Sequence, residues 1–70
     1  MLSIRLARPG DLEPFCDFLR DVHVRAEAAA DDVVQASIAG AASSHHAQRE
    51  LVGYVRTWNA LNPTSQVEVI

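Results

Sequence analysis

Apolar and polar residues alternate with a period of two in four short segments of the chain. In residues 2–6, three apolar side chains are separated by one serine and one arginine. The same alternation returns in three further segments, residues 22–28, 34–38 and 66–69. Such alternation is typical of β-strands with one buried face and one solvated face. The pattern therefore predicts four one-sided strands.

Two segments between these strands have apolar residues at the spacing of an α-helix. In the first, they recur at i, i+3, i+4 and i+7 as Leu12, Phe15, Cys16 and Leu19. Asp11 is the expected N-cap, and Pro14 fits the first turn, where its missing N–H costs little. The second helix is expected to begin near Ser43 or Ser44 and to end at Asn62-Pro63.

The order of these elements predicts the fold. Residues 29–32 are short enough for a hairpin between the second and third strands. The order is then βαββαβ, which is the α+β, ferredoxin-like topology. Right-handed crossovers place both helices on one face of a four-stranded antiparallel sheet, with the expected strand order 4-1-3-2. At 70 residues, the chain is expected to form a single domain, residues 1–70.

The predicted core follows from the strand faces and the helix stripes. It consists of Leu2, Ile4, Leu6, Leu12, Phe15, Cys16, Leu19, Val24, Ala26, Val34, Ala36, Ile38, Leu51, Tyr54, Val55, Trp58, Val67 and Val69. The stripe of the second helix also includes Ala47 and Leu61. Gly53 interrupts this helix at a cost of about 1 kcal/mol relative to alanine, so we expect it to pack closely against a neighbouring element.

Composition and charge exclude several classes of protein. The chain is 49% hydrophobic and 21% charged, which is typical of a folded globular domain. Its net charge of −3 argues against nucleic-acid binding, and all four aromatic residues lie on helices, where they cannot stack bases on the sheet. No apolar run approaches the ~20 residues of a membrane span, and no signal-peptide core is present, so a cytoplasmic location is expected.

Residues with catalytic or metal-binding chemistry are few. The single cysteine, Cys16, excludes a disulfide framework and lies within a helix stripe, where a buried, inert thiol is expected. His46 and Glu50 are i, i+4 neighbours beside His45 and are able to touch one metal ion, but no third ligand is evident. We therefore predict no catalytic residues, no metal and no cofactor.

The loop between the first strand and the first helix is a candidate ligand site. Backbone N–H groups at a helix N-terminus favour an anion, and an arginine adds positive charge. Arg8, Gly10 and Asp11 are therefore the predicted ligand-binding residues, although the same residues are also ordinary turn and cap formers. The segment Arg8-Pro-Gly-Asp-Leu12, with the strand order, resembles small regulatory domains of the ACT type. That resemblance implies paired domains that bind amino acids near Gly10 and Asp11.

A second resemblance concerns the start of the chain. The segment Ile4-Arg-Leu-Ala-Arg-Pro-Gly-Asp-Leu12 is similar to the beginning of many N-acetyltransferases. Those proteins are about twice as long and need a glycine-rich pyrophosphate loop. The segment Ile38-Ala-Gly-Ala-Ala-Ser43 does not supply such a loop.

The solvated face of the sheet is a candidate interface. Arg5, Arg25, Glu27 and Val33 are the predicted interface residues, because mixed charges can pair with their copies across a two-fold axis. A homodimer through the sheet is expected, by edge pairing or by face packing. The competing arrangement uses Phe18 and Val52, which lie beside their helix stripes.

Two functions are compatible with these features. The first is a small non-enzymatic binding or interaction module, which acts by self-association or with a protein partner. The second is a small dimeric ferredoxin-like enzyme with a site between sheet and helices, for which the histidines, Tyr54 and Arg5 are the candidates. A polar cavity beside Tyr54 or Trp58 favours the enzyme, and a solid core favours the module.

Overall fold

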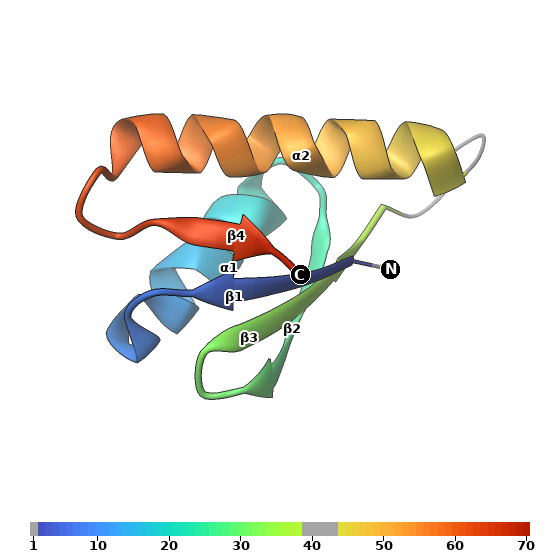
Figure 1. Ribbon diagram of the computed structural model, residues 1–70. Helices are drawn as coiled ribbons and strands as arrows, with labels where there is room; N and C mark the ends of the chain where they lie inside the picture. The colour runs from blue at the N-terminus through green and yellow to red at the C-terminus, as the bar shows by residue number, and fades with distance from the viewer. Residues whose placement is uncertain (1, 39–43) are drawn as a thin grey trace.

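The computed structural model describes residues 2–38 and 44–70. Its elements, in chain order, are β1 (Leu2–Leu6), the 3₁₀ turn η1 (Pro9–Asp11), α1 (Leu12–Asp21), β2 (Arg25–Ala30), β3 (Val33–Ser37), α2 (Ser44–Leu61) and β4 (Val67–Val69) (Figure 1). Ser43, the earlier of the two expected helix starts, lies outside the described residues. Within the described residues, no helix combines the length and the apolar character that crossing a membrane requires.

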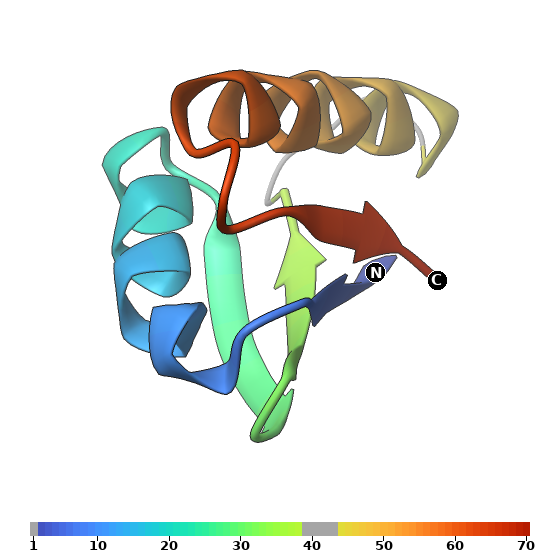
Figure 2. The ribbon, with the colours of Figure 1, turned by 60° about the vertical axis from the view of Figure 1, so that its left-hand side comes forward.

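The four strands form one antiparallel sheet, as expected. Their order across the sheet is β2-β3-β1-β4, which reads 4-1-3-2 when counted from the β4 edge. β1 lies inside the sheet, and pairs Ile4 with Val34 of β3 and with Val69 of β4. α1 and α2 lie over the same face of this sheet (Figure 2), so residues 2–38 and 44–70 leave the opposite face uncovered.

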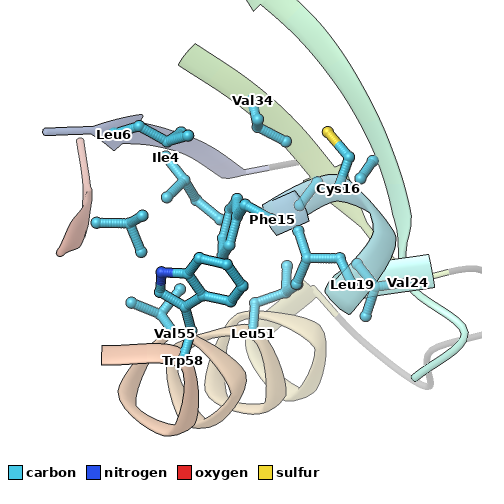
Figure 3. Close-up of a cluster of buried hydrophobic side chains, with 13 residues drawn as sticks. Ile4, Leu6, Phe15, Cys16, Leu19, Val24, Val34, Leu51, Val55 and Trp58 are labelled. Atoms are coloured by element: carbon cyan, nitrogen blue, oxygen red, sulfur yellow. The ribbon is translucent and has the colours of Figure 1, made fainter. Parts of the chain in front are cut away.

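One hydrophobic core fills the space between the sheet and the two helices (Figure 3). Its buried residues are Ile4, Leu6, Phe15, Cys16, Leu19, Val24, Ala26, Val34, Ala36, Leu51, Val55, Trp58 and Val67, all of which were expected there. Leu2, Leu12, Ile38 and Tyr54 are partly buried against this cluster. No described polar or charged residue is buried. The core is therefore apolar throughout the described chain.

Aromatic rings join the two helices. The rings of Phe15 and Trp58 meet edge to face with their centroids 5.1 Å apart. Phe18 meets the same indole at 5.4 Å and is partly buried against the core. Phe18 therefore makes part of its contacts inside the molecule, and the helix-mediated interface of Phe18 and Val52 stays a prediction.

One expected core residue, Val69, and one residue of the second helix's apolar stripe, Leu61, are exposed. Val69 is 37% exposed and Leu61 is 69% exposed. Val69 lies at the end of the three-residue edge strand β4, and Leu61 ends α2 one turn beyond its last buried residue, Trp58. The spacing of apolar residues predicted that both side chains face the core, but no described element extends far enough to cover them.

The second strand begins three residues later than expected, because α1 ends in a turn that the alternation conceals. The N–H of Val24 donates to the carbonyl of Leu19 at 2.9 Å, and that of His23 donates to the carbonyl of Arg20 at 3.0 Å. His23 has a φ of 63°. This is the Schellman arrangement, in which the residue after the C-cap is left-handed. His23 therefore lies in a helix-ending turn and not on the strand face.

The expectation for Gly53 is wrong. Gly53 is exposed on α2, and a Cβ built on it has no atom within 4 Å beyond its chain neighbours and the nearby backbone of its own helix. No neighbouring element approaches it, so the described chain gives no packing reason for a glycine at this position. Residues 45–50 of α2 also lie outside the core, and the first buried residue that follows them is Leu51.

Candidate functional site

The predicted interface residues share the face of the sheet that is turned away from the helices. Arg5 on β1 is directly opposite Val33 on β3. Arg25 and Glu27 project from β2 on the same face, with Glu27 opposite Gln35. The three charged side chains are exposed and Val33 is half-buried. The structure therefore places all four residues on one continuous surface.

The charges on this outer face balance one another. Arg5 is flanked by Val33 on one side and by Glu68 of β4 on the other. Arg5, Leu6, Ala7, Gln66, Val67 and Glu68 line a shallow hollow of about 380 Å³ at this corner of the sheet. On β2, Arg25 and Glu27 place one positive and one negative side chain two residues apart on the same face. A face with matched positive and negative groups is suited to a self-complementary contact.

A side chain of α1 blocks one edge of the sheet. Arg20 reaches over from α1, and its Nη2 donates to the carbonyl oxygen of Ala26 on β2 at 3.1 Å. Its Nη1 lies 3.7 Å from Oδ1 of Asp17, which helps to hold the guanidinium in place. The register between β2 and β3 also shifts between Ala28 and Ala30. An occupied main-chain acceptor and a bulge both disfavour the addition of another strand.

A side chain of α2 blocks the other edge more completely. The Gln66 carbonyl accepts from the Ala7 N–H, and the Ile70 N–H donates to the Ser3 carbonyl, so these backbone groups point from the β4 segment toward β1. Backbone groups alternate in direction along a strand, so the N–H and C=O of Val67 point away from β1. The side chain of Asn59 bonds both of them. Its Nδ2 donates to the Val67 carbonyl at 3.0 Å, and its Oδ1 accepts from the Val67 N–H at 2.8 Å.

Arg20 and Asn59, whose side chains bond the backbone of the edge strands, are positions that the sequence patterns missed. Both edges of the sheet carry a helix-borne side chain, so edge pairing is the less favourable form of the expected homodimer. Face packing leaves these hydrogen bonds intact. A signal for Asn59 exists in the sequence, because asparagine is a weak helix former whose side chain tends to bond backbone groups elsewhere.

The loop residues predicted to bind a ligand lie together, but much of the loop is already used. Nε of Arg8 is 4.0 Å from Oδ2 of Asp11. The N–H of Asp11 donates to the Arg8 carbonyl, and the N–H of Leu12 donates to the Pro9 carbonyl. Asp11 occupies the N-cap position without a side-chain cap bond. Its carboxylate at the start of α1 opposes a second anion, and ligand binding by Arg8, Gly10 and Asp11 stays a prediction.

The Cys16 thiol is buried in the core. Burial raises the pKa of the Cys16 thiol, and the acidic side chains of Asp17 and Glu13 add to this effect while Arg20 opposes it. The neutral thiol is therefore the form present near neutral pH, and it is a weak nucleophile.

The candidate residues of the enzyme alternative are not brought together. Arg5 projects from the outer face of the sheet, whereas Tyr54 packs against the core on the helix side. His45 and His46 lie in the exposed first turn of α2, and His23 lies in the turn after α1. Across residues 2–38 and 44–70, no three His, Cys, Asp or Glu side chains lie close enough to hold a metal ion.

The chain matches no family model, no curated protein and no solved structure. Its function must therefore be inferred from its own surfaces.

Proposed function

We propose that the protein is a small non-enzymatic interaction module, which self-associates through the outer face of its sheet. The observation that carries this proposal is the contrast between edges and face. Arg20 and Asn59 occupy main-chain groups at the two edges, while the broad face between them is uncovered. A four-stranded sheet with one uncovered face offers a larger surface than either edge.

The fold that we propose for this module is the ferredoxin-like plait. Its support is the element order βαββαβ, the antiparallel sheet with β1 and β3 inside, and two helices on one face. We further place the protein in the cytoplasm, in keeping with a single cysteine that is free and buried.

The core supports a binding function over an enzymatic one. Enzyme sites are concave and hold ionisable groups with perturbed pKa values. Here no described polar or charged residue is buried, and Trp58 uses its indole N–H to donate to the Ser65 carbonyl at 2.8 Å. Among the described residues, the space between sheet and helices is occupied by apolar side chains and by the neutral thiol of Cys16, and no charged side chain is buried there.

Charge reversal at Arg25 tests the proposed interface. In a two-fold face contact, Arg25 and Glu27 of one copy lie near Glu27 and Arg25 of the other. Arg25→Glu is expected to weaken self-association about tenfold, because it puts like charges together. The double variant R25E/E27R exchanges the two charges and is expected to restore association.

Sedimentation velocity over a range of protein concentrations measures both effects. Arg56→Glu on α2 is the matched control, since it makes the same change in net charge away from the sheet. A wild-type protein that stays monomeric at about millimolar concentration overturns self-association. A dimer that is indifferent to Arg25→Glu overturns the choice of surface.

A further inference from the structure

A second uncovered surface runs along α2. Its side chains recur at helical spacing over three turns, and they line a hollow of about 460 Å³ on the surface of the helix. We call this surface the α2 stripe, and its residues are His45, Gln48, Arg49, Val52, Gly53 and Arg56. The stripe belongs to neither the core nor the sheet face, and the proposed function does not use it.

The stripe is positively charged on a protein that is acidic overall. Arg49 and Arg56 are both exposed, and neither forms an ion pair within the described part of the chain. Glu50 is the single acidic residue of α2, and it lies about 100° around the helix from Arg49. The net charge of the chain is −3, so this stripe is a local exception. Two unpaired guanidinium groups on one face favour an acidic partner.

Gly53 lies between the two arginines along the helix. Apart from its chain neighbours and the nearby backbone of its own helix, no described atom lies within 4 Å of a Cβ at this position, so alanine fits there and is the better helix former. What glycine does provide is room for another backbone to approach closely. At this position glycine lowers the stability of the helix but allows another backbone to come close. This combination is expected at a docking site.

We propose that the α2 stripe docks an acidic α-helix of a partner protein. Arg49 and Arg56 are seven residues apart, which is about 10.5 Å along the helix axis. Two carboxylates at i and i+7 of another helix have the same separation and share one face. A small residue between them fits against Gly53, so that both ion pairs form while the two backbones are in close contact. Val52, next to Gly53, offers the partner helix an apolar contact.

The acidic helix of a second copy does not have this pattern. α1 carries Glu13, Asp17 and Asp21 at four-residue spacing, so a carboxylate and not a small residue lies midway between its outer acids. Asp17 is also held by Arg20 at 3.7 Å. Nucleic acids and anionic membranes are disfavoured by the net negative charge of the chain, which repels an extended polyanion. These observations favour a helix from a different protein.

Two capped, alanine-based helical peptides test this proposal. In the first, two glutamates are seven residues apart with alanine between them. In the second, which has the same composition, the glutamates are five residues apart and lie on different sides of the helix. The first peptide is expected to shift the backbone amide signals of the α2 stripe in heteronuclear NMR spectra of the labelled protein. The second is expected to bind about tenfold more weakly.

Three variants locate and define the contact. R49E/R56E is expected to weaken binding of the first peptide at least about tenfold. R5E/R25E makes the same change in net charge on the sheet and is expected to leave the peptide affinity unchanged, even where it disrupts self-association. Gly53→Ala is expected to raise the thermal midpoint by about 4–8 °C and yet to weaken the peptide about fivefold. A loss of affinity in a more stable protein cannot come from unfolding.

The contrary outcomes are equally specific. Equal binding of the two peptides overturns recognition of a helix face, and full affinity in Gly53→Ala overturns close approach. Equal displacement of the peptide by inorganic polyphosphate makes the stripe a general anion surface. If R49E/R56E dissociates the protein's own oligomer, the occupant is another copy of this chain. Each of these results rejects the proposal for the α2 stripe, and the peptide results do not depend on self-association.

Discussion

The side chain of Asn59 makes a sharp prediction about the β4 edge. Asn59→Ala removes one donor and one acceptor that together satisfy both backbone groups of Val67. The substitution leaves the apolar core untouched, because Asn59 is not among its residues. Any loss of stability then reports on these two hydrogen bonds and on the edge that they protect.

The expected magnitude follows from the two bonds. Each contributes about 1 kcal/mol net, so Asn59→Ala is expected to cost about 2 kcal/mol of unfolding free energy. For a chain of this length, that corresponds to a fall of about 8–16 °C in the thermal midpoint. The loss is a large part of the total stability, which is about 4–10 kcal/mol for 70 residues.

Urea denaturation and amide hydrogen exchange together measure this effect. The urea midpoint gives the free energy, and the exchange rate of the Val67 amide tests the specific bond that Asn59 accepts. Thr57→Ala is the matched control, since the bond that Thr57 Oγ1 forms in the described part of the chain is to the Gly53 carbonyl of its own helix, at 3.0 Å. That control is expected to change stability by less than about 0.5 kcal/mol.

One result refutes the reasoning directly. If the Val67 amide exchanges at the same rate in Asn59→Ala and in the wild type, this side chain does not protect the edge. A second consequence concerns association. With the β4 edge uncovered, Asn59→Ala is expected to form larger oligomers at high concentration, detectable by light scattering.

Further predictions concern the core, the thiol and the turn after α1. Leu51→Ala is expected to cost about 2–5 kcal/mol in urea denaturation, because Leu51 is fully buried between α2 and the sheet. The raised pKa of the Cys16 thiol means that the unfolded chain loses this proton first. Stability should therefore be complete below the ordinary thiol pKa and fall as pH rises above it, a slope that Cys16→Ala removes. His23→Gly is expected to raise stability by about 1 kcal/mol, since glycine adopts a φ of 63° without strain.

Most of the fold follows from periodicity, because one-sided strands and helix stripes leave few ways to bury their apolar faces together. Every buried residue, from Ile4 to Val67, was on a predicted stripe. Period does not predict where an element stops covering its neighbour, which is why Val69 and Leu61 were misplaced. It also does not reveal a left-handed turn that lacks glycine, so His23 was read as part of a strand.

The candidate surfaces were harder to predict than the fold. Placing Arg5, Val33, Arg25 and Glu27 on one face needs only strand parity and strand order. Arg20 and Asn59 each bond the backbone of a different element. Whether a side chain reaches that far depends on how the elements pack, and a local sequence pattern does not show it. The position of Gly53 was predicted correctly as helical, but its surroundings depend on the three-dimensional packing.

α2 is continuous in shape but consists of two segments with different sources of stability. From Leu51 onward, Leu51, Val55 and Trp58 anchor the helix to the core, whereas the side chains of residues 45–50 are exposed, apart from half-buried Ala47. A helical segment as short as this first one is unstable alone in water, so it persists by extension from the anchored turns. Its amide protons are expected to exchange by unwinding from the N-terminal end. A partner helix bound along the α2 stripe, from Arg56 to His45, would suppress that unwinding. Binding at the stripe and helix formation in residues 45–50 are therefore thermodynamically linked.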